Sequence, residues 1–172
     1  MAKPVPLYTE PVPLTAAHDI AEFQSGEPAL DEWPRARALQ NMDMAASKTY
    51  VICAQGTQRV VGFYAICMGQ ILNQDATGAM RRNMPRHIPA VILGRLAIDQ
   101  NGQGKGLGQA LLQDAVMRSE RAANDVSARL LVVHAISPAA EAFYLHHGFT
   151  QLPVEASTFA LDLVKLKKAL SG

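Results

Sequence analysis

The 172-residue sequence predicts an α/β fold in which helices flank a mixed sheet. Apolar runs at residues 90–99 and 129–136 are typical of buried strands. Between these runs, residues 106–124 repeat apolar side chains at helical spacing. Two further strand-like runs precede this strand–helix–strand order, and further strands follow it. A mixed sheet covered by helices accounts for the whole succession.

The N-terminal part predicts one short strand and two helices. Residues 5–12 contain prolines that sheets tolerate at an edge, so we expect a short edge strand there. Residues 15–23 are expected to form a short helix, and residues 28–46 a second one. Pro34 is awkward inside that second helix, because an interior proline breaks or kinks a helix. Alternatively, Asp31 caps a fresh start with Pro34 in its first turn.

The middle of the chain predicts a hairpin and then an irregular segment. Residues 48–55 and 59–70 are apolar strands, joined by a short turn that contains Gly56. Residues 73–87 are polar and follow no period, so we expect them to be irregular and mobile.

The C-terminal third predicts a helix, two strands and a closing helix. Residues 138–147 are helical in pattern and stop at Gly148, a residue type that commonly ends helices. A strand begins at Phe149, residues 157–163 pair with it, and a short lysine-rich helix follows.

Length and composition predict one globular domain over residues 1–172, in the cytoplasm. Hydrophobic residues make up 49% of the chain, and no apolar run approaches the roughly 20 residues of a membrane span. The start of the chain is too short and proline-broken for a signal peptide. Cys53 and Cys67 lie in strand-like runs and are expected to be reduced core residues. The five histidines are scattered, so no metal site is expected.

Charge is distributed unevenly although the net charge is only +1. Residues 1–34 carry −5, and residues 35–105 carry +6. A basic middle attracts polyanions. The alternative is a solvated surface with a single phosphate-binding loop, and composition alone leaves both open.

The glycine-rich run at residues 103–108, QGKGLG, lies between a strand and a helix. Glycine lets several main-chain N–H groups point into one concavity at a helix N-terminus, where phosphate binds favourably. A Walker loop is excluded because no Ser or Thr follows a Gly-Lys pair, and a Rossmann fingerprint fails because Gln109 occupies its third glycine position. The pattern that fits is Q-x-x-G-x-G.

That pattern, in Gln103, Gly106 and Gly108, resembles the acetyl-CoA pyrophosphate loop of the GNAT acetyltransferases. The segment SPAAEAFYLHHGF at residues 137–149 resembles the family helix that ends in Tyr-x-x-x-Gly-Phe. The resemblance covers essentially the whole chain. It implies the GNAT fold, with a mixed, mostly antiparallel sheet, flanking helices and splayed central strands.

The resemblance also implies the site. Main-chain N–H groups of the loop hold the pyrophosphate, and Lys105 either adds charge or faces water. The pantetheine arm pairs with the exposed strand like an added strand, and the N–H near Leu96 faces the thioester carbonyl. Tyr144 protonates the leaving thiolate, or alternatively is a core tyrosine. Ser137 replaces a family Asn. The expected cofactor-binding residues are Leu96, Ala97, Ile98, Gln103, Gly104, Lys105, Gly106, Leu107, Gly108, Ser137 and Phe143.

Further segments resemble the toxin acetyltransferases of bacterial toxin–antitoxin pairs, the TacT and AtaT type. These are SGEPALDEW, ALQN, SKTYVI, VVGFYAI, RRNMP and LGRLAID, although Pro34 stands where a Leu usually follows the Trp. The resemblance implies acetylation of the free amino group of aminoacyl-tRNA, a ribbon–helix–helix antitoxin as partner, and a homodimer. The basic middle agrees with an RNA substrate.

Six arginines are candidate tRNA contacts. Those in the irregular segment either clamp the acceptor end or are solvated charges, and Arg95 interrupts an apolar strand. The candidates are Arg35, Arg37, Arg81, Arg82, Arg86 and Arg95.

Two other functions remain open at this point. A GNAT enzyme for a small amine or a protein N-terminus shares the fold and Tyr144 but needs no basic surface of tRNA size. A binding module without catalysis keeps the sheet, although the intact glycine loop argues against it.

Overall fold

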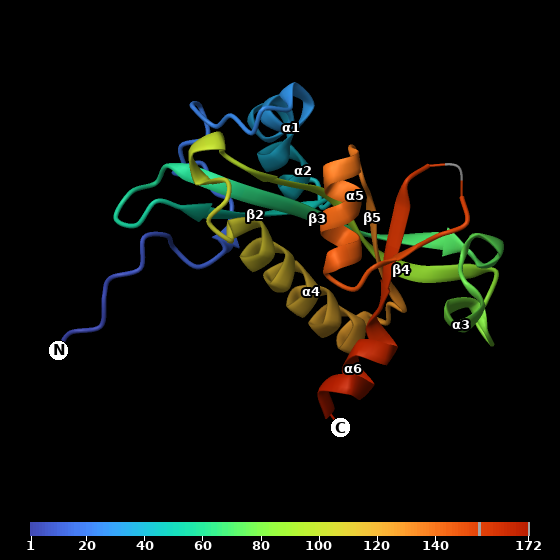
Figure 1. Cartoon of the computed structure of the whole chain (residues 1–172). Helices are drawn as coiled ribbons and strands as arrows, with labels where there is room; N and C mark the ends of the chain where they lie inside the picture. The colour runs from blue at the N-terminus through green and yellow to red at the C-terminus, as the bar shows by residue number, and fades with distance from the viewer. Residues whose placement is uncertain (155, 172) are drawn as a thin grey trace. The chain divides into compact units, whose positions relative to one another are not determined.

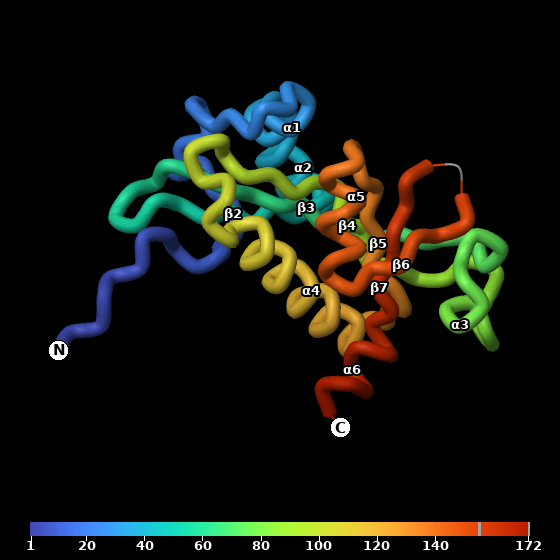
Figure 2. Tube along the Cα trace, in the orientation of Figure 1, coloured from blue at the N-terminus to red at the C-terminus, as the bar shows by residue number. Residues whose placement is uncertain are grey.

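The computed structural model describes residues 1–154 and 156–171. The chain folds into two compact units (Figures 1 and 2). Unit 1 comprises Met1–Ile66 and Arg95–Ala115, and unit 2 comprises Cys67–Gly94 and Val116–Gly172.

Within the described residues, the sheet has seven strands in the order β1-β2-β3-β4-β5-β7-β6. β4 and β5 pair in parallel, while β1–β2, β2–β3, β5–β7 and β6–β7 pair antiparallel. The sheet is therefore mixed and mostly antiparallel, as predicted. The strands are β1 (Val12–Pro13), β2 (Lys48–Cys53), β3 (Val60–Leu72), β4 (His87–Ile98), β5 (Leu130–His134), β6 (Thr150–Gln151) and β7 (Thr158–Asp162).

The helices follow the predicted order from the glycine loop onward. The loop is followed by the longest helix, and a helix after β7 closes the chain. The helical elements are α1 (Pro28–Trp33), η1 (Pro34–Ala38), α2 (Leu39–Asp43), η2 (Asn73–Asp75), α3 (Gly78–Arg81), η3 (Gln100–Gly102), α4 (Leu107–Val126), α5 (Pro138–His146) and α6 (Leu163–Ser171).

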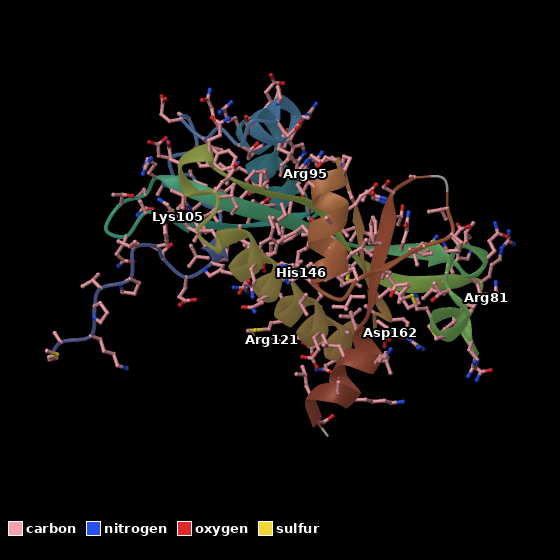
Figure 3. All side chains as sticks on the ribbon, viewed as in Figure 1. Arg81, Arg95, Lys105, Arg121, His146 and Asp162 are labelled. Atoms are coloured by element: carbon pink, nitrogen blue, oxygen red, sulfur yellow. The ribbon has the colours of Figure 1, made fainter. Side chains whose placement is uncertain are left out.

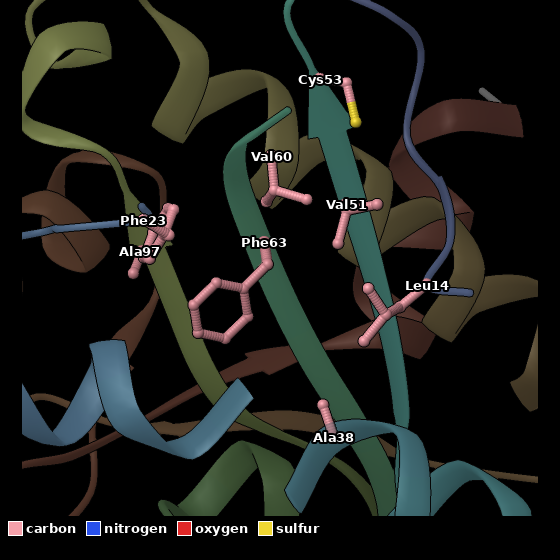
Figure 4. Packing of buried hydrophobic residues seen from close by; sticks show 8 residues of the cluster. All are labelled: Leu14, Phe23, Ala38, Val51, Cys53, Val60, Phe63 and Ala97. Atoms are coloured by element: carbon pink, nitrogen blue, oxygen red, sulfur yellow. The ribbon is translucent and has the colours of Figure 1, made fainter. Parts of the chain in front are cut away.

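The core of unit 1 packs α1, η1 and α2 against β2 and β3 (Figures 1 and 4). Phe63 is 1% exposed and makes an edge-to-face contact with Phe23, with ring centroids 5.4 Å apart. Trp33 stacks on the same ring at 6.4 Å. Burying an aromatic side chain of this size stabilises a fold by about 1.5–3 kcal/mol. Phe23 and Trp33 are therefore packing residues of this unit.

Pro34 does not end the helix that begins at Pro28. The chain stays helical to Asp43, and residues Pro34–Ala38 adopt a π-helix between two α-helical stretches. Proline cannot donate the usual main-chain hydrogen bond and its ring crowds the preceding turn, so the wider π turn accommodates it. The predicted fresh start capped by Asp31 is wrong. That carboxylate instead accepts hydrogen bonds from Ser25 N at 2.7 Å and Ser25 Oγ at 2.6 Å.

The predicted helix over residues 15–23 is also wrong. Thr15 and His18 form a turn, in which Thr15 N donates to Nδ1 of His18 at 2.9 Å. The chain then runs alongside the start of β3, where Asp19 N donates to Gln58 O and Val60 N donates to Asp19 O. Pairing with a strand supplies the hydrogen bonds that a short isolated helix would have to make alone. The predicted strand at residues 5–12 is reduced to an isolated bridge at Tyr8 and to β1.

Residues 73–87 are structured rather than irregular. They contain η2 and α3, and Met80 of α3 is only 6% exposed within the core of unit 2. The segment connects β3 to β4 (Figure 2). α3 has four residues, and Met80 is the one that is buried, so the sequence shows no helical period from which this helix could be predicted.

Candidate functional site

The glycine loop of unit 1 has the geometry of an anion-binding turn. Gly104 and Gly106 adopt φ values of +77° and +78°, the left-handed region, with Lys105 between them. All three are exposed, and a Cβ added at either glycine would meet no atom within 4 Å. The loop therefore has open space at the start of α4, the kind of place where main-chain N–H groups can bind an anion. Figure 3 shows Lys105 on this segment.

Two polar side chains hold the loop to the N-terminal segment. Gln103 Nε2 donates to Ser25 O at 2.8 Å and to Ile98 O at 3.0 Å. Asp99, which is 6% exposed, accepts from Gln24 N and from Asn101 N, both at 3.0 Å. The side-chain amide of Gln103 thus fixes the loop, and its main-chain N–H donates to Gln100 O at 3.4 Å.

Leu96, Ala97 and Ile98 form the end of β4. The ladder between β4 and β5 pairs Ala90–Leu93 with Leu130–Val133, and β4 continues beyond it to Ile98. Ala97 is 5% exposed and packs into the core of unit 1, whereas its two neighbours are half-buried. The main chain of this strand end runs into the glycine loop. At the other side of that loop, Leu107 is 8% exposed and Gly108 lies in the first turn of α4.

Tyr144 of unit 2 lies on α5 and is 6% exposed. Its ring contacts Phe143 at 5.2 Å and Phe149 at 5.4 Å between centroids. Burial raises the pKa of the Tyr144 hydroxyl to about 12. The phenol therefore keeps its proton at neutral pH and is available as a proton donor.

Ser137 and Phe143 occupy different roles on the same helix. Ser137 is the N-cap of α5, and its Oγ accepts a hydrogen bond from Ala140 N at 3.1 Å. Phe143 is half-buried and packs edge-to-face on His147, with centroids 4.6 Å apart. Burial and the neighbouring His146 lower the pKa of His147.

The six candidate arginines lie in three places. Arg35 and Arg37 are exposed on η1, and Arg35 donates to the main-chain oxygens of Ile20 and Phe23. Arg95 on β4 stacks over Trp33, 4.1 Å from the ring centroid, and burial lowers its pKa. The exposed arginines of the α3 region are Arg81, Arg82 and Arg86.

The sequence analysis did not identify the residues that hold the main chain of the α3 region. Asn73 donates its side-chain amide to three main-chain oxygens of the α3 region. Arg129 pairs with Asp162 at 2.9 Å and also reaches Ala79 O. The only sequence signal for Asn73 was its position at the end of an apolar run, which is typical of any turn.

Within residues 1–154 and 156–171, no group of three or more His, Cys, Asp or Glu side chains is arranged to hold a metal ion. No helix in that part of the chain has the length and apolar character needed to cross a bilayer. Cys53 and Cys67 are free thiols; burial raises the pKa of Cys53, and Cys67 is half-buried.

Comparison with known proteins shows similarity to a family and to curated relatives at the level of sequence. The family model described as "Acetyltransferase (GNAT) domain" matches residues 46–151. A tRNA-acetylating toxin of Mycobacterium tuberculosis (strain ATCC 25618 / H37Rv) is 43% identical over 165 residues, covering 96% of this chain and 98% of the relative.

Solved structures of toxins share the fold. The toxin AtaT complexed with acetyl-methionyl-tRNAfMet superposes with a TM-score of 0.87 and 26% identity, covering 95% of this chain and 99% of that one. A tyrosine-to-phenylalanine mutant of AtaT, bound to the C-terminus of the antitoxin AtaR and to acetyl-CoA, gives a TM-score of 0.80 at 26% identity, with 96% and 99% covered.

Proposed function

This chain belongs to the GNAT acetyltransferase family, and we propose that it transfers an acetyl group from acetyl-CoA to the free amino group of an aminoacyl-tRNA. Acetylation of that amine stops translation, so the protein acts as the toxin of a toxin–antitoxin pair. The observation that carries the proposal is the 43% identity to a tRNA-acetylating toxin along 96% of this chain. The solved complex of AtaT with acetyl-methionyl-tRNAfMet supports the same substrate class.

The glycine loop binds the pyrophosphate of acetyl-CoA. The left-handed residues Gly104 and Gly106 turn successive N–H groups toward the open side of the loop, and the dipole of α4 adds positive potential there. We expected donors among the main-chain N–H groups of residues 103–108; that of Gln103 already donates to Gln100 O, so we assign the role to residues 104–108. Lys105 lies between the two left-handed glycines. The end of β4, Leu96–Ile98, pairs with the peptide-like pantetheine arm. The main-chain N–H of Leu96 donates to the thioester carbonyl.

Tyr144 acts as the general acid. When bound, acetyl-CoA supplies an activated acetyl thioester and departs as a thiolate. The Tyr144 hydroxyl, whose pKa burial raises to about 12, remains protonated over the physiological range and donates its proton to that sulfur. Phe143 and Phe149 hold the ring from two sides, which fixes the direction of the hydroxyl. Phe143 and the cap residue Ser137 complete the set that we assign to the cofactor.

The substrate amine requires little help to lose its proton. A peptide α-amino group has a pKa of about 8, and esterification to tRNA lowers it further. A large fraction of the amine is then neutral at pH 7 and ready to attack. A strong general base is unnecessary for such a substrate.

The basic residues bind the RNA. Arg81, Arg82 and Arg86 present exposed guanidinium groups, which neutralise phosphates of the acceptor end. Arg35 and Arg37, which are exposed on η1 of unit 1, are further RNA contacts that we propose. The guanidinium of Arg95 lies over the Trp33 ring, 4.1 Å from its centroid, and we propose that it contacts a base of the RNA.

The partner is an antitoxin, which we expect to be of the ribbon–helix–helix class, and we expect the toxin to be a homodimer. The solved complex of the AtaT mutant with the C-terminus of AtaR supports an antitoxin partner. We further propose that the chain is one GNAT domain and acts in the cytoplasm, where charged tRNA and acetyl-CoA are available.

Incubation with radiolabelled acetyl-CoA tests the proposal. The protein is mixed with total charged tRNA, with deacylated tRNA, and with a panel of small amines and peptides. Label on aminoacyl-tRNA alone is the expected result. Label on a small amine or a peptide N-terminus would instead establish the alternative GNAT function, which uses the same loop and Tyr144.

A further inference from the structure

One residue, Asn73, connects the two ends of the segment that carries three of the candidate arginines. We call residues 73–87 the arginine segment. Asn73 lies directly after β3, and its main-chain N–H donates to Arg86 O at 2.8 Å. This bond joins the first and the penultimate residues of the segment.

The side chain of Asn73 reaches the middle of the same segment. Its Nδ2 donates to Arg81 O and Met84 O at 3.1 Å each, and Pro85 O lies 3.3 Å away. A carboxamide has two N–H donors, so three carbonyl oxygens saturate it. Asn73 therefore contacts the main chain of Arg81 and of Arg86, on both sides of Arg82.

A second anchor holds the opposite side of the segment. Met80 is 6% exposed in the core of unit 2, and Met84 packs against that core. Arg129 donates to Ala79 O at 3.4 Å and is itself held by two hydrogen bonds to Asp162. The main chain of α3 is thus fixed, while the side chains of its arginines remain exposed; Figure 3 labels Arg81 there.

Fixing the main chain has a consequence for polyanion binding. A mobile loop must lose conformational entropy when its arginines engage phosphates, whereas a preformed loop has already lost it on folding. We infer that Asn73 is a positioning residue, which holds Arg81, Arg82 and Arg86 in a preformed arrangement that receives the phosphate backbone of tRNA. This inference rests on the function proposed above and names the residue that organises its RNA contact.

The substitution Asn73→Asp tests the inference with almost no change in shape. It replaces the donor amide by a carboxylate that faces three carbonyl oxygens, so the segment should open. Asn83→Asp is the matched control, because it adds the same charge to the same segment at an exposed position. Asn83 has a φ of +59°, which aspartate also adopts. Asn73→Ser, which removes the amide without adding charge, serves if the aspartate variant is poorly folded.

Three measurements compare the variants with the wild type. Trypsin cleaves after Arg81, Arg82 and Arg86, and we expect cleavage there to be about tenfold faster in Asn73→Asp. Affinity for uncharged tRNA, measured by fluorescence anisotropy, should fall about fivefold further than in Asn83→Asp. Affinity for acetyl-CoA should stay at the wild-type value in both variants.

The outcomes separate this inference from the proposed function. Three results would overturn the positioning role. The first is wild-type resistance to trypsin in Asn73→Asp, and the second is an equal loss of tRNA affinity in Asn73→Asp and Asn83→Asp. The third is a loss of acetyl-CoA affinity in Asn73→Asp as large as its loss of tRNA affinity. A wild-type protein that binds tRNA but acetylates no charged tRNA would overturn the proposed function. Faster cleavage and weaker tRNA binding confined to the Asn73 variants would still support the inference in that case.

Discussion

Replacing Gly104 by alanine should weaken acetyl-CoA binding, although the added methyl group causes no steric clash. Gly104 has a φ of +77°, and an added Cβ would meet no atom within 4 Å. The cost is therefore conformational, about 1–2 kcal/mol for an L-residue in the left-handed region. Because the loop is exposed, we expect it to relax in the free protein and to recover its shape only on binding. The dissociation constant for acetyl-CoA should then rise by roughly 5- to 30-fold.

Gly78→Ala is the matched control for this prediction. Gly78 is the first residue of α3, lies outside the left-handed region, and likewise has no atom within 4 Å of an added Cβ. Alanine should be neutral or slightly stabilising there. Isothermal titration with acetyl-CoA and thermal unfolding without ligand measure both variants. Strain that persists in the free Gly104→Ala protein would appear instead as a Tm lowered by about 2–8 °C. The reasoning is refuted if that variant matches Gly78→Ala in both its affinity and its Tm.

Three further predictions address the acid, the RNA contact and the Arg129–Asp162 pair. Tyr144→Phe keeps the ring contacts but removes the proton donor, so kcat should fall about 10²–10⁴-fold while acetyl-CoA binding and Tm are retained; near-normal turnover would exclude Tyr144 as the acid. Reversing charge at Arg81 and Arg82 should weaken tRNA binding and flatten its dependence on salt by about 0.9 per lost phosphate contact, with acetyl-CoA affinity unchanged; an unaltered salt slope would show that these arginines do not touch the RNA. Burial alone would raise the pKa of Asp162, but the hydrogen bonds that this carboxylate accepts, first of all from Arg129, lower it overall. The Arg129–Asp162 pair therefore stabilises the fold at pH values above the unfolded pKa of about 3.9. This stabilisation is lost as the pH falls through the pKa of Asp162 in the folded protein. Asp162→Asn should therefore lower the free energy of unfolding by about 1.5–3 kcal/mol at pH 7, and urea melts in which this difference fails to shrink in acid would contradict the assignment.

The elements with a strong period were predictable from the sequence. The hairpin, β4, α4, β5 and α5 all lie where apolar spacing and glycine signals placed them, within a few residues. The mixed sheet followed from their order, and the glycine loop from its position between a strand and a helix. These features depend on local patterns, which a single sequence displays directly.

The errors arose where distant residues decide local structure. Residues 15–23 have helical spacing, but pairing of Asp19 with the chain at Gln58 and Val60 overrides it. Pro34 stays inside a helix because the turn widens to a π-helix, a choice that its sequence position does not reveal. The arginine segment was predicted to be irregular, since the side-chain hydrogen bonds of Asn73 that organise it reach across up to twelve positions and leave no local pattern.

The proton balance of the reaction favours an ester-activated amine over a lysine-like one. Tyr144, the acid that we propose, carries its proton at neutral pH and so does not take one from the substrate amine. An alkyl ammonium with a pKa of about 10.4 would be almost entirely protonated at pH 7 and would require a separate base. An aminoacyl ester presents a neutral amine without one. A site whose proposed acid is already protonated at neutral pH therefore suits substrates whose amine is weakly basic, such as aminoacyl-tRNA.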